Sequence, residues 1–205
     1  MVRGGFLMPF VDPQPQPPSF PAYFLYEKLP HTHQEDGADF TLLRKTGKEK
    51  LLLEALDAVM PSISNIELLA PGGIPLLWAT LSDGIMLPVP LLGDGGMRLL
   101  RIVLKIGRTA NGVVFIDEVG HGIHYSILDT MWRVINKASE AFNTQVIATT
   151  HSFEAIAAAH RAFSEKDQYK RFQYLRLDKI RGKIRPVFLD QQQLELAIAS
   201  GFEVR

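Results

Sequence analysis

One β-α-β unit in the middle of the chain constrains the fold more than any other feature. Val113 to Ile116 is a short apolar run typical of a buried strand, and it ends in the adjacent carboxylates Asp117 and Glu118. Apolar residues then recur at helical spacing over 126–142, and a second buried strand is expected over 145–149. The crossover of such a unit is almost always right-handed and leaves its strands parallel. The sequence therefore predicts an α/β fold.

Three polar side chains are expected to meet at one edge of this sheet. Asp117 and Glu118 follow the first strand and His151 follows the second, and open α/β folds place ligands at the carboxyl ends of their strands. The pattern indicates nucleotide hydrolysis. Asp117 would orient the Mg²⁺ that bridges the phosphates of ATP, Glu118 would polarise the attacking water, and His151 would contact the terminal phosphate or that water. The alternative is that Asp117 caps a turn and Glu118 simply faces water.

A cluster of glycines leads directly into the next helix, which we expect over 96–106. This cluster consists of Gly93, Asp94, Gly95 and Gly96. Free backbone N–H groups and the helix dipole make such a start an anion site. The competing interpretation is a tight turn in which Asp94 caps the helix.

The same helix carries Arg98, Arg101, Lys105 and Arg108 along one face. Such a basic stripe is typical of a solvated helix face. We therefore assign it no role in the predicted site.

The chain contains no Gly-x-x-x-x-Gly-Lys-Ser/Thr phosphate loop, which a nucleotide hydrolase uses to hold the α- and β-phosphates. The nearest segment, from Lys45 to Lys48, lacks the leading glycine and the preceding buried strand, so we reject it. We do not expect tight ATP binding by the isolated chain.

Several of these motifs occur in a linked order: Leu-Pro-x-x-x-x-Gly-Asp-Gly-x-x-Arg-Leu-Leu at 87–100, Phe-Ile-Asp-Glu at 115–118, Gly-x-His-Tyr-Ser at 122–126 and Ala-Thr-Thr-His-Ser at 148–152. Over roughly residues 38 to 205 this order resembles the ABC/SMC-like AAA ATPases of prokaryotes, which are related to the ATPase part of overcoming-lysogenization-defect nucleases. The resemblance implies the C-terminal lobe of a P-loop NTPase, with parallel core strands, a short N-terminal β-meander and a C-terminal β-hairpin.

The resemblance also implies roles for individual residues. The segment from Gly93 to Gly96 occupies the place of the ABC signature, which in that family reaches across a dimer to the partner's terminal phosphate. Asp117 and Glu118 match the Walker B pair, and His151 matches the switch histidine. The implied cofactors are ATP and Mg²⁺, and the implied partner is a second copy or a chain that carries the Walker A loop.

Two departures from the family pattern stand out. Gly122 and His124 match the loop that touches the dimer partner, but family members commonly carry Glu-Asn before its glycine, where this chain has Gly120-His121. In addition, the N-terminal lobe that carries the phosphate loop is missing. The function that follows is an ATP-hydrolysing component that needs a Walker A lobe from elsewhere. The alternative is a truncated, non-hydrolysing remnant that acts as a binding or regulatory module.

A different chemistry is metal ligation by Asp117, Glu118, His121 and His124, which lie close together in the sequence. The two histidines would converge if they lay on a helix, whereas the glycines around them favour a loop. We rank this interpretation below the ATPase.

Nucleic-acid binding is a third class. Between Lys170 and Arg185 there are seven Lys or Arg residues and a single acid, Asp178, beside Phe172 and Tyr174. Basic hairpins with aromatic residues bind phosphate backbones. Edge strands carry cations equally often to prevent aggregation.

The composition is that of an ordinary globular protein of 205 residues, with 22 basic and 22 acidic residues and no cysteine. No signal peptide or membrane span is evident, so we expect a cytoplasmic protein without a membrane partner.

Residues 1–22 form a proline-rich tail, expected to be extended or disordered, and 23–205 are expected to form a single lobe. Residues 31–39 are expected to form a loop. The other expected elements are a helix at 47–60, a strand hairpin at 66–70 and 76–81, a helix at 153–163, a hairpin at 172–189 that turns near Gly182, and a helix at 191–200.

Overall fold

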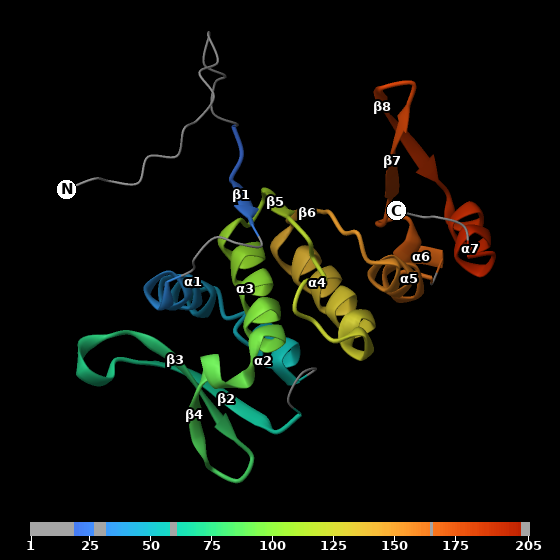
Figure 1. The fold of residues 1–205 in the computed structure, drawn as a ribbon. Coiled ribbons are helices and arrows are strands. Elements are labelled where there is room, and N and C mark those ends of the chain that lie inside the picture. Colours follow the sequence, from blue (N-terminus) through green and yellow to red (C-terminus); the bar gives the residue numbers. More distant parts are fainter. Residues whose placement is uncertain (1–18, 27–31, 58–60, 165, 202–205) are drawn as a thin grey trace.

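The structure is a computed structural model that describes residues 19–26, 32–57, 61–164 and 166–201. Most of the proline-rich segment predicted at 1–22 lies outside these residues. The described elements form a parallel sheet with its helices, an antiparallel meander and a C-terminal hairpin unit (Figure 1). The helices are α1 (His33–Lys45), α2 (Lys50–Asp57), α3 (Asp94–Arg108), α4 (Leu128–Phe142), α5 (Phe153–Ala162), α6 (Lys166–Tyr169) and α7 (Gln191–Ala199).

The central sheet has three parallel strands in the order β1-β5-β6. They are β1 (Ala22–Leu25), β5 (Val113–Ile116) and β6 (Gln145–Ala148). The sequence predicted β5, α4 and β6 as one β-α-β unit, and this α/β arrangement with parallel core strands is confirmed. It did not predict β1, because four residues that follow a proline-rich segment give no periodicity to recognise.

The two faces of this sheet have different environments. Helix α3 packs on β1 and β5, and the side chains on that face, such as Leu25 and Ile116, are buried. On the opposite face Phe24, Phe115 and Ile147 lie side by side in register across the three strands. Phe24 and Ile147 are each 44% exposed, and the rings of Phe24 and Phe115 stack with centroids 5.8 Å apart. The sheet therefore presents an open apolar row to solvent.

Helix α1 replaces the loop predicted over 31–39. Thr32 caps it: the Thr32 hydroxyl accepts a hydrogen bond from the Glu35 amide at 3.2 Å, and the Glu35 carboxylate accepts one from the Thr32 amide at 3.3 Å. The prediction was wrong because two residues that face the protein interior are acids, Asp36 and Asp39, so the helix has no clear apolar stripe.

These buried acids pair with the basic stripe of α3. Arg101 binds Asp36 at 3.2 Å, while Lys105 and Arg108 both bind Asp39, at 2.6 and 2.7 Å. Lys105 is only 2% exposed and Asp39 1%. The prediction that this stripe is a solvated face was therefore wrong, because α1 supplies opposite charges that a single-helix view does not show.

Two antiparallel units complete the fold. The meander consists of β2 (Ile63–Leu69), β3 (Leu76–Leu81) and β4 (Met86–Pro88), and it packs against α1 and α2. The C-terminal hairpin consists of β7 (Tyr174–Ile180) and β8 (Lys183–Leu189). Both the meander and the hairpin with its turn at Gly182 are confirmed. Among the described helices, none has the length and apolar character needed to cross a membrane.

We expect Asp39→Ala to lower the free energy of unfolding by about 3 to 5 kcal/mol, because it leaves the buried Lys105 ammonium without its counter-charge. Glu54→Ala is the matched control. It breaks the Lys137–Glu54 pair, whose side chains are 62% and 50% exposed, and should cost less than about 1 kcal/mol. Urea unfolding measures both. If the two variants lose equal free energy of unfolding, the buried pair stabilises the fold no more than the exposed pair does.

The same pair predicts a response to alkaline pH. Burial lowers the pKa of Lys105, but the hydrogen bond and charge of Asp39 outweigh this effect and raise it above 10.5. The stabilisation is therefore complete below the unfolded-state pKa of about 10.4 and is lost as the pH rises through the higher folded-state pKa. The free energy of unfolding should be higher for the wild type than for Lys105→Met by a constant amount from neutral pH to about pH 10. Above about pH 10 this difference should become smaller.

Candidate functional site

The ends of β5 and β6 bring the predicted catalytic residues together. Ile116 and Ala148 are partners in the parallel ladder, so the residues that follow them leave the sheet at the same edge. The Asp117 amide still donates a hydrogen bond to the Leu25 carbonyl at 2.9 Å, which ties this edge to β1 as well. Asp117, Glu118 and His151 thus lie at the carboxyl edge of the sheet, as their positions after the strands predicted.

Thr149 links the two carboxylate residues. Its hydroxyl donates to Oδ1 of Asp117 at 2.9 Å and accepts from the Glu118 amide at 3.1 Å. Its carbonyl also accepts from the Val119 amide at 3.0 Å. Glu118 has φ +48°, a left-handed conformation that is uncommon for any residue other than glycine. These contacts hold the strained turn in place, since such a conformation persists only where its surroundings fix it.

Glu118 and His151 contact each other directly. Nε2 of His151 lies 3.3 Å from Oε1 of Glu118, and the His151 amide donates to Oε2 at 3.2 Å. The Glu118 side chain is 26% exposed and the His151 side chain 90%. The carboxylate is therefore held by the histidine backbone, while the imidazole ring is open to an incoming ligand.

Arg98 of α3 supports the backbone turn at Asp117 and Glu118. Its Nη2 donates to the carbonyl oxygens of Asp117 at 2.6 Å and of Glu118 at 3.2 Å. Sequence reasoning missed Arg98 because it grouped this residue with the basic stripe of α3. It also gave no role to Thr149, although Thr149 directly follows β6 and stands two residues before His151.

The glycine motif lies at the start of α3, next to the loop that follows Glu118. Gly93 precedes the helix with φ +84°, and Gly93 and Asp94 are exposed. A Cβ on Gly95 would lie 3.1 Å from the Gly122 carbonyl oxygen, so this position packs tightly on the loop. The structure therefore brings Gly93 to Gly96 against the loop at Gly122. The chemistry of the motif stays a prediction.

The geometry does not support a protein-only metal cage. Nδ1 of His124 hydrogen bonds with the Ser126 hydroxyl at 2.9 Å, at the start of a short 3₁₀ turn. Among the residues that the structure describes, no three His, Asp or Glu side chains are placed to hold an ion together. Magnesium needs less, because it keeps several waters and binds proteins through one or two carboxylates plus substrate phosphates. Asp117, fixed by Thr149, fits that requirement.

Comparison with known proteins identifies the family. Residues 8–157 match the family described as "AAA domain, putative AbiEii toxin, Type IV TA system". This chain belongs to that AAA family. An "ATP/GTP phosphatase" of Helicobacter pylori (strain ATCC 700392 / 26695) is 34% identical to it over 84 residues, which are 39% of this chain and 22% of that protein. The AAA chain therefore aligns with less than a quarter of this relative.

Solved structures show the same fold as this AAA chain. A structure from a study titled "Structural biochemistry of ATP-driven dimerization and DNA stimulated activation of SMC ATPases" superposes with a TM-score of 0.54 at 12% identity, over 79% of this chain and 96% of that one. An Smc head domain derived from Pyrococcus furiosus gives 0.50 at 12% identity, over 81% and 40%. One derived from Pyrococcus yayanosii gives 0.50 at 14% identity, over 74% and 28%. The predicted resemblance to SMC-like AAA ATPases is confirmed.

We expect Thr149→Val to lower the free energy of unfolding by about 1 kcal/mol, because it removes the hydroxyl that bonds both Asp117 and the Glu118 amide. Thr149→Ser keeps the hydroxyl and should retain most of the stability. Thermal and urea unfolding compare the two. If Ser and Val lower stability equally, the hydroxyl does not hold the turn.

Proposed function

We propose that this chain is the part of an AAA ATPase that supplies the catalytic carboxylates, the switch histidine and the signature-like glycines. The phosphate loop of the same ATP site comes from another polypeptide segment. The observation that carries the proposal is the held arrangement of Asp117, Glu118 and His151 at the carboxyl edge of the sheet. Catalysis of phosphoryl transfer is mostly positioning and electrostatic stabilisation, which is what such a rigid edge supplies.

Each of the three residues has a separate role in this proposal. Asp117, oriented by Thr149, would hold Mg²⁺, which neutralises charge on the nucleotide phosphates when bound. Glu118 accepts the proton of the attacking water, and the His151 amide orients its carboxylate for that task. The exposed imidazole of His151 would contact the terminal phosphate.

The open side of the sheet is where we place the missing lobe. Strand β6 is an edge strand within the described sheet, and the apolar row of Phe24, Phe115 and Ile147 lies exposed beside it. An exposed edge next to an apolar face favours the addition of another strand and its helix. A strand that leads into a phosphate loop would pair with β6, bring the loop to the edge occupied by His151, and cover the apolar row with its helix.

The glycine motif suggests a dimer. Gly93 and Asp94 are exposed at the start of α3, where backbone N–H groups favour an anion. The motif packs on the loop at Gly122, which follows the turn at Glu118. We propose that the exposed motif contacts a nucleotide held by a second copy or by the partner that carries the phosphate loop.

The second candidate function is a non-hydrolysing binding or regulatory module. The absence of a phosphate-loop motif from the 205 residues favours it. The intact Asp117, Glu118 and His151 favour hydrolysis, because a strained turn such as that at Glu118 is costly to keep without a use.

The test is ATP turnover with Mg²⁺ in the presence of a polypeptide that carries the phosphate loop, sought first in the DNA flanking the coding sequence. Glu118→Gln should lower turnover by roughly 100- to 10,000-fold, because it removes the general base, while ATP binding by the assembled pair persists. Glu54→Gln, an exposed glutamate on α2, is the matched control and should leave turnover unchanged.

The two candidate functions give different results in this assay. A complex that binds ATP without turnover supports the regulatory module. Turnover that survives Glu118→Gln removes the proposed role of this carboxylate.

A further inference from the structure

The tip of the β7–β8 hairpin concentrates positive charge in a chain with no net charge. Between Tyr174 and Leu189 there are five cationic residues and one acid, while the whole chain has a formal net charge of +0. The acid, Asp178, is bound by Arg176 through two hydrogen bonds of 2.6 and 3.0 Å. The remaining cations are Lys179, Arg181, Lys183 and Arg185, all exposed and, within the described part of the chain, without an ion pair.

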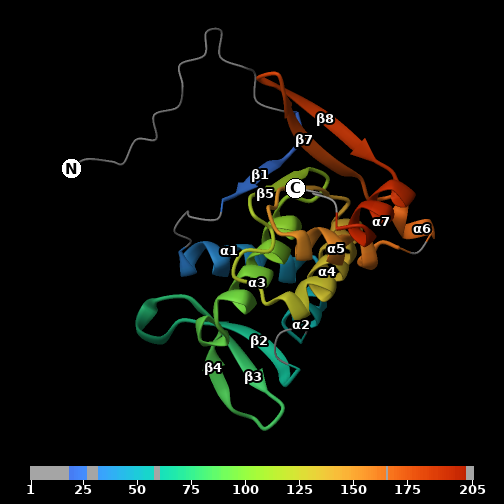
Figure 2. The same ribbon diagram turned by 45° about the vertical axis from the view of Figure 1, so that its right-hand side comes forward.

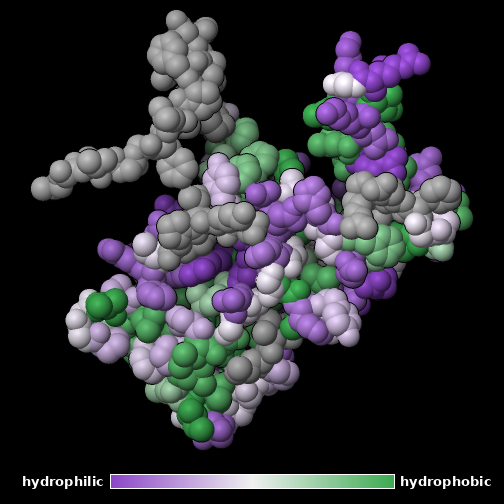
Figure 3. All heavy atoms as spheres, viewed as in Figure 1, coloured by the Kyte–Doolittle hydropathy of each residue, from purple (hydrophilic) through white to green (hydrophobic). Residues whose placement is uncertain are grey.

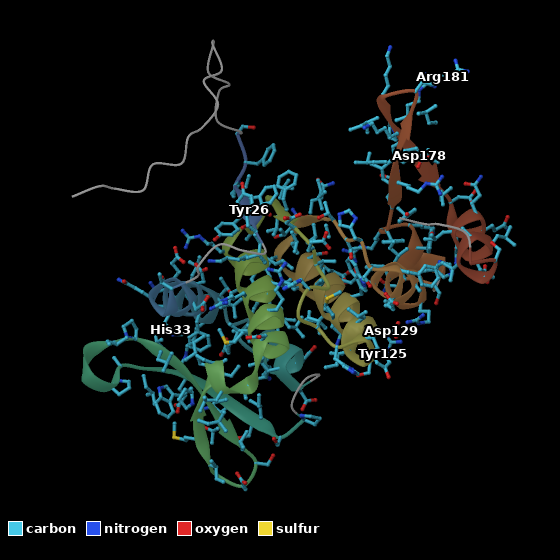
Figure 4. The ribbon with its side chains drawn as sticks, in the orientation of Figure 1. Tyr26, His33, Tyr125, Asp129, Asp178 and Arg181 are labelled. Atoms are coloured by element: carbon cyan, nitrogen blue, oxygen red, sulfur yellow. The ribbon has the colours of Figure 1, made fainter. Side chains whose placement is uncertain are left out.

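The hairpin projects away from the body of the molecule. Figures 1 and 2 show β7 and β8 extending beyond α5 and α7. Arg181 stands at the outer end, and Asp178 lies further down the same hairpin (Figure 4). In the space-filling view the end of the hairpin is hydrophilic, and hydrophobic and hydrophilic side chains lie together below it (Figure 3). A protruding charged tip of this kind is free to meet a partner without a change elsewhere in the fold.

The backbone makes the tip narrow and fixed. Arg181 and Gly182 both have positive φ, at +49° and +78°, which is the conformation of a two-residue turn matched to the twist of the strands. Ile180 pairs with Lys183 directly across this turn. The tip is therefore only two strands wide, with its cations at defined positions.

Charge and apolar side chains alternate on both faces of the tip. Lys179 lies opposite Ile184 on one face, and Lys183 lies opposite Ile180 on the other. Ile180 is 47% exposed and Ile184 is 70% exposed. A membrane-surface element separates its apolar face from its cationic face, so this arrangement does not favour a lipid surface.

We infer that the hairpin tip binds duplex DNA. The B-form major groove admits a two-stranded β-ribbon, and four unpaired cations can contact phosphates on the two sides of the groove. The tip has isoleucines where a single-strand binder has stacking aromatic residues, and the major groove of an RNA duplex is too narrow for a ribbon. This inference is independent of ATP hydrolysis, because the hairpin is separate from Asp117, Glu118 and His151.

The experiment measures binding of a labelled mixed-sequence DNA duplex, about two helical turns long, to the full chain without nucleotide. The wild type should lose roughly 100-fold in affinity between about 50 and 200 mM salt, as expected for four phosphate contacts. The test variant changes all four tip cations to glutamine: Lys179→Gln, Arg181→Gln, Lys183→Gln and Arg185→Gln. It should bind at least about 10-fold more weakly at low salt and lose most of the salt dependence.

A matched control removes the same number of charges elsewhere. It combines Arg44→Gln, Lys45→Gln, Lys50→Gln and Arg133→Gln, four exposed cations on α1, α2 and α4. The control should bind the duplex as the wild type does. Circular dichroism checks that both variants keep the fold, as we expect because all eight side chains are exposed.

Four results would overturn the inference. The first is no duplex binding by the wild type at low salt, and the second is an equal loss in the test and control variants. The third is tighter binding of single-stranded DNA or of an RNA duplex of the same sequence. The fourth is binding to vesicles that contain phosphatidylserine together with no binding to DNA.

Discussion

The structure depends on α3, which is fixed by charge at both of its ends. Near its C-terminus, Lys105 and Arg108 bind the buried Asp39 of α1, and near its N-terminus Arg98 binds the carbonyl oxygens of Asp117 and Glu118. Breaking either contact would leave polar groups buried or a strained turn unsupported, and both cost more than a surface ion pair. One helix thus sets the position of α1, the buried side of the sheet and the site.

How far the sequence predicts this fold depends on whether an element carries a periodic signal. The β-α-β unit, the meander and the C-terminal hairpin have apolar patterns or turn residues of their own, so they could be predicted. Helix α1 could not, because Asp36 and Asp39 are buried only by virtue of Arg101 and Lys105, far away in the sequence. Pairing between distant charges is invisible to any analysis that treats one segment at a time.

The residues of the site also divide into those that the sequence predicts and those that it does not. Asp117, Glu118 and His151 could be placed at one edge because parallel strands end together, a rule that needs no side-chain detail. Thr149 and Arg98 could not, since their roles are hydrogen bonds to a backbone turn whose left-handed φ at Glu118 the sequence does not reveal. The charged residues to which we assign the chemistry are thus easier to predict than the residues that hold them in place.

The open side of the sheet explains how the function that we propose combines a rigid site on this chain with a phosphate loop from another polypeptide segment. The buried face of the sheet is closed by α3, so Asp117 and Glu118 keep their positions without any further strand. The opposite face, with Phe24, Phe115 and Ile147, gains stability only when it is covered. A lobe that covers this face would bury apolar surface and bring its phosphate loop to the site in a single step. In the proposed function, the free energy gained by covering this face would also drive completion of the ATP site, so the site would be active only in the assembled state.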